Sequence, residues 1–387
     1  MNFDYSDEQQ QLADSVRKYL ANEYDFEKRK AILNSASGTS DAVWAAFAEM
    51  GLTAIALPEA DGGFGGGAVD LMAVMEACGE ALVVEPLADN VGLAGRLVAR
   101  AGSAAQRGAL LPGLIDGSLR LAFASSEPGG RYGLAPVGTT ARAVGDGWVL
   151  DGDKCVVIGA PSASRLIVSA RTGGQPGGAG EAGDAAGVSL FIVDPHAAGV
   201  ALNPSRTVDG LRTADVKFSG VALGADALLG GAGMLGGALP HIEEAVDFAT
   251  ALQCADAIGA MKSANDATLD YMKQRKQFGV PIASFQVLQH RMVEMYICTE
   301  QARSMAILAA SKVDTATDPV ERARAVSAAK VKVADAARQV SQESVQLHGG
   351  MGMTEELKVS HTFRRLTMIA QRFGDADHHL ERLAALT

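Results

Sequence analysis

The first third of the chain carries apolar residues at helical spacing. Ser6 and Gln9 form a capping-box pattern at the start of a helix, and Leu12, Val16 and Leu20 fall on one face of that helix. The same periodicity predicts three further helices, over residues 41–50, 68–82 and 104–118. We therefore predict an N-terminal α-helical domain over residues 1–119.

The periodicity changes near Leu121, where the chain turns to short runs rich in β-branched residues. Gly, Asp and Asn divide these runs, a pattern that predicts an antiparallel sheet. The runs cover residues 139–152, 165–172, 188–195 and 214–223. A glycine-rich insert over residues 172–187 has little apolar surface to bury, so we expect a flexible surface loop there. We predict a middle β-barrel domain over residues 120–234.

Long amphipathic patterns return after Gly237. They predict helices over residues 241–276, 284–313 and 319–347, and a shorter helix after Gly352. Long helices with continuous apolar stripes form bundles and often associate with other chains. We predict a C-terminal four-helix bundle over residues 235–387, which makes the fold class α+β and mainly α.

The composition narrows the possible functions. With 34 Lys and Arg residues against 45 Asp and Glu residues the formal net charge is −11, and no basic stripe is present to neutralise nucleic-acid phosphates. No apolar run is long enough to span a bilayer, and the acidic, polar N-terminus lacks the pattern of a signal peptide. We expect a cytoplasmic protein without nucleic-acid or membrane partners.

The cysteines give no sign of a metal site or a disulfide framework. Cys78, Cys155, Cys254 and Cys298 lie far apart without paired spacing, so we expect free, buried thiols. Two adjacent histidines near the C-terminus point to different sides of a helix and cannot share a metal ion. The sequence therefore predicts no metal.

Three motifs indicate more than the fold. They are FASSEPGG at 123–130, RKQFGVPIASFQVLQ at 275–289 and QLHGGMGMTEELKVSHTFRRL at 346–366. Arg275, Gln277 and Phe278 offer a buried guanidinium fork for pyrophosphate oxygens, an amide and an apolar wall. Gly349 and Gly350 allow the backbone to approach a ligand ahead of an expected helix N-terminus, where N–H groups point at anions.

These motifs and the α–β–α order resemble the flavin-dependent acyl-CoA dehydrogenase family along essentially the whole chain. The resemblance implies FAD as cofactor, an acyl-CoA thioester as substrate, a tetramer, and electron-transfer flavoprotein as electron acceptor. In the family, the second and third motifs reach across a subunit interface to hold the ADP half of a neighbour's FAD. By resemblance the cofactor-binding residues are Arg275, Gln277, Phe278, Gln346, Gly349 and Gly350, with Ser125 and Ser126 in the first motif.

The family's reaction needs a carboxylate that is missing from its usual position. This base removes the α-proton of the thioester while the β-hydrogen leaves as a hydride to the flavin. In most members the base is a glutamate in a Tyr-Glu-Gly triplet, and this chain has Phe373 and Gly374 there. The position used by a minority of the family is Ala249. Glu243 and Glu244 lie more than one turn away, so we expect them to be helix N-terminal charges.

Two further positions depart from the family pattern. Val156 and Ile158 stand where the flavin-facing strand usually offers an aromatic and a hydroxyl residue. GRYG at 130–133 replaces the usual Gly-Ser-Asp, although Glu127 and Pro128 are retained and the loop is expected to keep its shape. The sequence is most similar to the small subunit of bacterial pimeloyl-CoA dehydrogenases, and it also resembles the paired dehydrogenases of steroid breakdown.

Three interpretations account for these departures. In the first, the chain is one subunit of a heteromeric acyl-CoA dehydrogenase whose related partner carries the glutamate and the isoalloxazine pocket. In the second, a homotetramer uses Asp375 or Asp377 as the base, helped by His378 or His379; the alternative is that one of these aspartates caps the final helix. In the third, the chain is a non-catalytic scaffold or CoA-binding member. A dicarboxylyl-CoA such as pimeloyl-CoA is one substrate class, with Arg131 as a candidate clamp.

Overall fold

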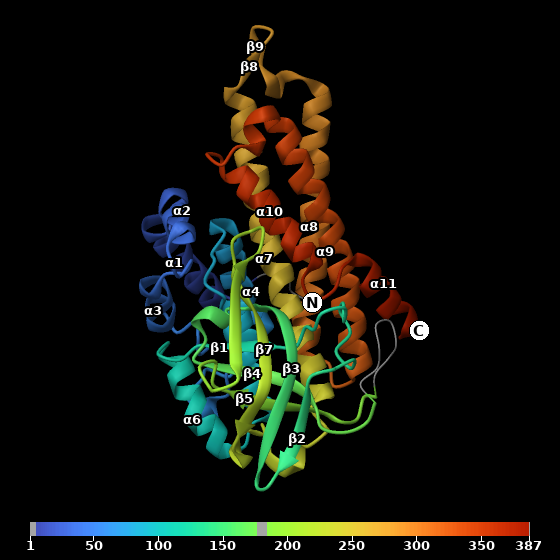
Figure 1. Ribbon diagram of the computed structural model, residues 1–387. Helices are drawn as coiled ribbons and strands as arrows, with labels where there is room; N and C mark the ends of the chain where they lie inside the picture. The colour runs from blue at the N-terminus through green and yellow to red at the C-terminus, as the bar shows by residue number, and fades with distance from the viewer. Residues whose placement is uncertain (1–4, 176–183, 387) are drawn as a thin grey trace. The chain divides into compact units, whose positions relative to one another are not determined.

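The computed structural model describes residues 5–175 and 184–386 (Figure 1). Two units emerge from the contacts between residues. The first contains the chain up to Leu33, Gly67–Val83 and the chain from Thr250 onward, and the second contains Asn34–Gly66 and Val84–Ala249. The predicted surface loop lies partly at 176–183, outside the described residues. The three-domain boundaries at 119 and 234 stay a sequence-based prediction.

The first unit is helical apart from one short hairpin. Its elements are α1 (Asp7–Glu23), α2 (Phe26–Asn34), α4 (Ala68–Ala81), most of α7 (Leu239–Gln274), β8 (Lys276–Gln277), β9 (Val280–Pro281), η6 (Ile282–Ser284), α8 (Gln286–Thr315), α9 (Pro319–His348), η7 (Gly349–Met353), α10 (Lys358–Gln371) and α11 (Ala376–Ala385). Helix α9 packs against α8, α10 and α11 through a face of buried alanines and valines, whose small size allows close contact (Figure 1). The hairpin β8–β9 lies at the tip where α7 ends and α8 begins.

The second unit is built on a seven-stranded sheet. The strands are β1 (Leu121–Ala124), β2 (Thr140–Val144), β3 (Gly147–Ile158), β4 (Arg165–Arg171), β5 (Val188–Val193), β6 (Val200–Arg206) and β7 (Arg212–Leu223). They run in the order β1-β4-β2-β3-β7-β6, with β5 paired to β4. Leu150, Phe191 and Phe218 belong to the buried core between the strands. The helices and short turns of this unit are α3 (Asp41–Glu49), η1 (Glu59–Asp61), η2 (Ala88–Gly95), α5 (Arg96–Ala101), α6 (Ala104–Ile115), η3 (Ala160–Ser162), η4 (Ala225–Ala227) and η5 (Gly231–Met234).

Most sequence-predicted elements are confirmed. The capping box is present, because the Gln9 N–H donates to Ser6 Oγ at 3.2 Å and the Ser6 N–H donates to Gln9 Oε1 at 2.9 Å. The mainly α fold with a central sheet is confirmed as well. The long helical patterns correspond to α7, α8 and α9 within a few residues at each end.

The prediction of a purely antiparallel sheet was wrong. Strands β1 and β4 pair in parallel, from Leu121 opposite Arg165 to Ala124 opposite Val168, whereas β3, β6 and β7 pair antiparallel. The chain forms β2 and β3 before it returns to pair β4 with β1, and alternation of side chains cannot reveal such a crossover. Among the elements that were not predicted are α2, η2, α5, β1 and β6, and β6 is a largely exposed strand containing Pro204.

Within the described part of the chain, no helix is both long enough and apolar enough to cross a bilayer.

Candidate functional site

The turn between α10 and α11 contains Phe373 and Gly374, the residues that the sequence resemblance aligns with the usual base. Phe373 (φ 58°) and Gly374 (φ 117°) both have left-handed backbone conformations. The fully buried Lys330 of α9 supports this turn, because its Nζ donates to the carbonyl oxygens of Ala370 at 3.3 Å, Arg372 at 2.7 Å and Gly374 at 2.6 Å. Burial lowers the pKa of Lys330 to about 8. One ammonium group thus closes the end of α10 and fixes the turn after it.

His379 supports the same turn from α11. Its Nε2 lies 3.1 Å from the carbonyl oxygen of Phe373, and its Nδ1 lies 3.1 Å from Ser327 Oγ on α9. A carbonyl oxygen only accepts, so Nε2 carries the proton and Nδ1 accepts from the hydroxyl. Burial, together with the nearby Lys330, lowers the pKa of His379 to about 3, so the ring is neutral. Both ring nitrogens are therefore engaged in holding the turn.

Asp375 caps helix α11. Its Oδ1 accepts the backbone N–H of His378 at 2.9 Å, which satisfies a donor at the start of the helix. Asp377 lies exposed in the first turn of α11. The capping role that the sequence allowed is thus confirmed for Asp375, and a base role for Asp375 or Asp377 stays a prediction. Burial and the nearby Arg382 lower the pKa of His378.

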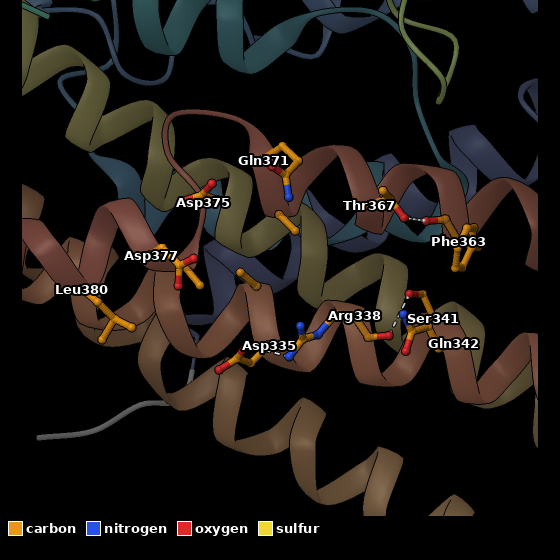
Figure 2. A pocket seen from close by; sticks show the side chains of 13 residues that line it. Asp335, Arg338, Ser341, Gln342, Phe363, Thr367, Gln371, Asp375, Asp377 and Leu380 are labelled. Carbon is orange, nitrogen blue, oxygen red and sulfur yellow. Dashed lines mark hydrogen bonds and ion pairs between the residues drawn. The ribbon is translucent and has the colours of Figure 1, made fainter. Parts of the chain in front are cut away.

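Asp375 and Asp377 line a cavity of about 460 Å³ between α9, α10 and α11 (Figure 2). Asp335 and Arg338 of α9 lie at the same cavity and form an ion pair of 3.5 Å. Phe363 and Leu380 contribute apolar lining. Three carboxylates against one guanidinium make the cavity acidic, so it is poorly suited to a phosphate group.

The minority base position offers no proton acceptor. Ala249 is fully buried in the second unit. Glu244, five residues earlier on α7, is held in an ion pair with Arg96 at 2.5 Å and with Arg100 at 3.2 Å. The Arg96 guanidinium also lies 3.8 Å from the ring centroid of Phe248. Glu244 is therefore paired with two arginines, which is compatible with its expected role as a helix-terminal charge.

The hairpin β8–β9 presents the first set of predicted cofactor-binding residues. Arg275, Gln277 and Phe278 are all exposed, and the Phe278 side chain is 91% accessible. Phe278 has φ 54°, and the only ring contact recorded for it within the described residues is an edge-on contact with Phe285 at 6.2 Å. The prediction of a buried Arg275 is wrong for the single chain. The left-handed backbone at Phe278 therefore carries an aromatic ring that is open to solvent.

The glycine pair after α9 lies open to solvent. Gly349 has φ 60°, and a Cβ added at Gly349 or Gly350 would meet no atom within 4 Å. Gln346, one turn earlier, is exposed. The pair begins the short 3₁₀ turn η7 and α10 starts only at Lys358, so the expected helix N-terminus does not follow directly. The backbone remains free for close approach by a ligand.

The loop with Ser125 and Ser126 keeps a fixed shape in the second unit. The carboxylate of Glu127 accepts the N–H groups of Gly138 at 2.6 Å and Thr139 at 2.9 Å, and it pairs with the buried Lys154 at 2.7 Å. Burial disfavours the charged carboxylate, but this pairing with Lys154 and the hydrogen bonds lower the pKa of Glu127.

Both serines contribute their backbone oxygens to this support. Ser125 O accepts from Lys154 Nζ at 3.2 Å, and Ser126 O accepts from the Cys155 N–H at 2.8 Å. These two hydrogen bonds join the loop to Lys154 and Cys155, neighbouring residues of β3.

Val156 and Ile158 lie next to this loop on β3. The register of β3 against β7 shifts between Lys154 and Val157, and Val156 has φ 53°, an outlier for a β-branched residue. The Val156 N–H donates to Asp215 Oδ1 at 3.0 Å, and its side chain is 52% exposed. The bulge thus presents an aliphatic side chain where the family usually has an aromatic one.

The described residues contain no group of three or more His, Cys, Asp or Glu side chains placed to hold a metal ion. The four cysteines, all within the described residues, form no disulfide; Cys78 and Cys254 are buried, and Cys155 and Cys298 are partly exposed.

Comparison with known proteins identifies the family. Models of the N-terminal, middle and C-terminal domains of acyl-CoA dehydrogenases match residues 6–118, 122–221 and 239–386. The chain belongs to the acyl-CoA dehydrogenase family. It is 32% identical over 379 residues to acyl-CoA dehydrogenase FadE12 of Mycobacterium bovis, covering 95% of this chain and 93% of that protein.

Two similar solved structures are named after a pair of proteins. A Tcur3481–Tcur3483 steroid ACAD variant is 30% identical with a TM-score of 0.82, covering 98% of this chain and 97% of that one. The ChsE4–ChsE5 complex of Mycobacterium tuberculosis is 25% identical with a TM-score of 0.87, covering 100% of this chain and 98% of that one.

Lys330 was not among the sequence-predicted site residues, although a lysine within the apolar stretch around residues 326–336 is a signal that could have found it.

Proposed function

We propose that this acyl-CoA dehydrogenase-family chain is one subunit of a heteromeric, FAD-dependent enzyme that dehydrogenates an acyl-CoA thioester between its α and β carbons. A related subunit carries the glutamate base and the isoalloxazine wall. The observation that carries the proposal is the turn at Phe373, which Lys330 and His379 hold in place although it presents no carboxylate.

The tip of the helical unit fits the ADP half of a flavin. Arg275 offers a guanidinium fork, Phe278 an exposed aromatic face, and Gly349 and Gly350 open backbone. All four residues are exposed on their own chain, which favours a nucleotide bound to a neighbouring subunit. When FAD is bound it supplies the hydride acceptor, and Arg275, Gln277, Phe278, Gln346, Gly349 and Gly350 would anchor its ADP half.

The residues at the isoalloxazine end do not fit. Val156 provides an exposed aliphatic side chain, Ile158 has no hydroxyl, and Phe373 cannot accept a proton. The retained ADP-side residues and the lost flavin-side residues together favour a site completed by two unlike chains. The paired names of the Tcur3481–Tcur3483 and ChsE4–ChsE5 relatives support the same arrangement.

Helix α8 supports assembly with other subunits. Val287, Val293, Tyr296 and Ile297 are all between 47% and 66% exposed on this helix. An exposed apolar stripe of this kind marks an association surface. We infer a tetramer of this chain with a related subunit, with electrons passed to an electron-transfer flavoprotein as in the family.

A homotetramer with its own base is the second candidate. Asp375 and Asp377 line the cavity between α9, α10 and α11, where a small movement would free the Asp375 carboxylate from its cap. A non-catalytic scaffold or CoA-binding role is the third candidate, and the retained Arg275 and Phe278 argue against it. For the substrate we infer a thioester of the dicarboxylyl-CoA class, such as pimeloyl-CoA, with the exposed Arg131 as a clamp for the distal carboxylate.

The test is a visible absorption spectrum and native mass of the chain, purified alone and with a co-expressed related subunit, before and after addition of acyl-CoA thioesters. We expect flavin, and its bleaching by thioester, only in the two-chain complex. A yellow homotetramer that bleaches would contradict the heteromeric assignment, and loss of bleaching in Asp375→Asn or Asp377→Asn would then identify the base. A complex with thioester affinity but no flavin would favour the scaffold.

A further inference from the structure

An aromatic contact joins the two segments that carry the proposed nucleotide-binding residues. Tyr271 lies in the last turn of α7, and its carbonyl oxygen accepts the Arg275 N–H at 2.8 Å. His348 is the last residue of α9 and directly precedes Gly349. The two rings stack with centroids 4.4 Å apart and planes inclined by 27°. This stack therefore connects the base of the hairpin with the base of the glycine turn.

The imidazole ring of His348 has a fixed orientation and a fixed tautomer. Its Nδ1 lies 2.8 Å from the carbonyl oxygen of Ser344, one turn earlier on α9. Because a carbonyl oxygen only accepts, Nδ1 carries the proton and Nε2 is unprotonated. Burial lowers the pKa of His348, so the ring is neutral at neutral pH, and only 5% of the residue is exposed. Helix α9 thus presents a rigid face to Tyr271.

The hairpin has little internal stability of its own. Strands β8 and β9 share only two residue pairs, Lys276 with Pro281 and Gln277 with Val280, and a two-stranded hairpin of this size is marginal in water. A further hydrogen bond from the Ile282 N–H to the Arg275 carbonyl closes it at 2.8 Å. The direction in which the hairpin leaves the bundle is therefore set by the end of α7, which the stack fixes against α9.

We propose that Tyr271 and His348 are positioning residues that set the distance between the Arg275 hairpin and the Gly349–Gly350 turn, so that one ADP group can contact both segments. The inference rests on the proposed function, because the ligand is the ADP half of the FAD assigned there. It adds two residues that do not themselves need to touch the nucleotide.

The test compares Tyr271→Leu, which removes the ring, with Tyr271→Phe, which keeps it. The first measurement is FAD binding to the flavin-depleted two-chain complex, with ADP as competitor. We expect Tyr271→Leu to weaken binding of both at least about tenfold, because misplacing one of two binding segments loses the contacts of that segment. Tyr271→Phe should restore wild-type affinity.

The second measurement is amide hydrogen exchange of the full-length chain over residues 275–282 and 349–354. We expect faster exchange in both segments for Tyr271→Leu. Tyr271→Phe should exchange at the wild-type rate, and exchange in the middle of α9 should be the same in all three proteins. Weaker nucleotide binding without a change in exchange would mean direct contact by Tyr271 and would overturn the positioning role, as would unchanged binding and exchange. If the wild-type complex binds neither FAD nor ADP, the proposed function fails, and the exchange data alone decide whether the stack positions the two segments.

Discussion

The turn at residues 370–374 and the hairpin at residues 275–281 contain the same unusual feature and differ in everything that surrounds it. Each places a phenylalanine in a left-handed conformation, Phe373 at φ 58° and Phe278 at φ 54°. At the turn, Lys330 and His379 bind the backbone on both sides of Phe373. At the hairpin, Phe278 is 91% exposed and its neighbours are exposed as well.

The difference shows where a single chain can stabilise a left-handed phenylalanine with its own residues. Strained backbone persists where the surroundings determine it, and the buried ammonium and imidazole groups meet that need at the turn. The hairpin lacks such support within the described residues of its own chain. We infer that its conformation serves contacts with a ligand or subunit, so stability should respond to changes at the turn and assembly should respond to changes at the hairpin.

The largest effect on stability is expected from Lys330→Met. The change leaves three carbonyl oxygens, one buried and two partly buried, without their shared donor, and we expect the free energy of unfolding to fall by about 3 kcal/mol. Lys332→Met, at a half-exposed position of the same helix, is the matched control and should change it by less than about 0.5 kcal/mol. Urea unfolding measures both. Equal small effects would mean that water can replace Lys330.

The difference in the free energy of unfolding between wild type and Lys330→Met should depend on pH, because burial lowers the pKa of Lys330. The pKa is about 8 in the folded chain and 10.5 for an ordinary lysine, so between these values the unfolded chain holds more protons. Stability contributed by Lys330 therefore rises with pH in this window, by up to about 1.4 kcal/mol per pH unit. The gap between wild type and Lys330→Met should widen from pH 8 to 10. A constant gap would contradict a buried, desolvated ammonium.

Glycine substitutions compare the two regions directly. An alanine at Gly374 would place its Cβ 2.4 Å from His378 Cδ2 and 2.7 Å from His379 Nε2, at a φ of 117° that alanine disfavours. We expect Gly374→Ala to cost about 2 kcal/mol. Gly350→Ala meets no atom within 4 Å and should leave unfolding unchanged while weakening flavin binding. A stability loss in Gly350→Ala similar to that in Gly374→Ala would contradict the distinction between a turn fixed by its own chain and a glycine pair open to a ligand.

Much of the fold could be predicted because the long helices α7, α8 and α9 have long uninterrupted runs of helix-compatible residues, and α1 has both an apolar face and the Ser6–Gln9 capping box. The parallel pairing of β1 with β4 could not, because strand pairing depends on contacts remote in sequence. The π-helix η2 was missed because its glycines and buried Asp89 and Asn90 do not form a helical stripe. Local patterns identify elements better than they identify the partners of those elements.

The site was predictable where motifs are contiguous and less so where support comes from elsewhere. Residues 275–278 and 346–350 could be located from their letters alone. The partners of Lys330 could not, because they lie at 370–374, about forty residues away, and neither could the stacking of Tyr271 on His348. The role of Asp375 as a cap was one of two alternatives until the His378 N–H was seen to bind it.

Acid should weaken the turn through His379. Its pKa is about 3 in the folded chain and 6.5 for an ordinary histidine, so the unfolded chain takes up the proton first as pH falls below 6.5. The stability that the neutral His379 ring contributes is present above pH 6.5 and is lost as the pH falls toward 3. Between pH 6.5 and 5.5 we expect wild type to lose about 1 kcal/mol more than His379→Gln, measured by urea unfolding. Parallel curves for the two proteins would place His379 in solvent.

The smallest stability effect is expected at the hairpin, from Phe278→Ser. Phe278 is 91% exposed, so loss of its ring should change the free energy of unfolding by less than about 0.5 kcal/mol. The same change should reduce the flavin content and the native mass of the two-chain complex, because most of the ring surface is open to another molecule. Val144→Ser, at a 54% exposed position on β2, is the control and should affect neither stability nor assembly. A full flavin content in Phe278→Ser would mean that the strained, exposed ring has no part in binding, and the contrast between the hairpin and the turn would then lose its functional meaning.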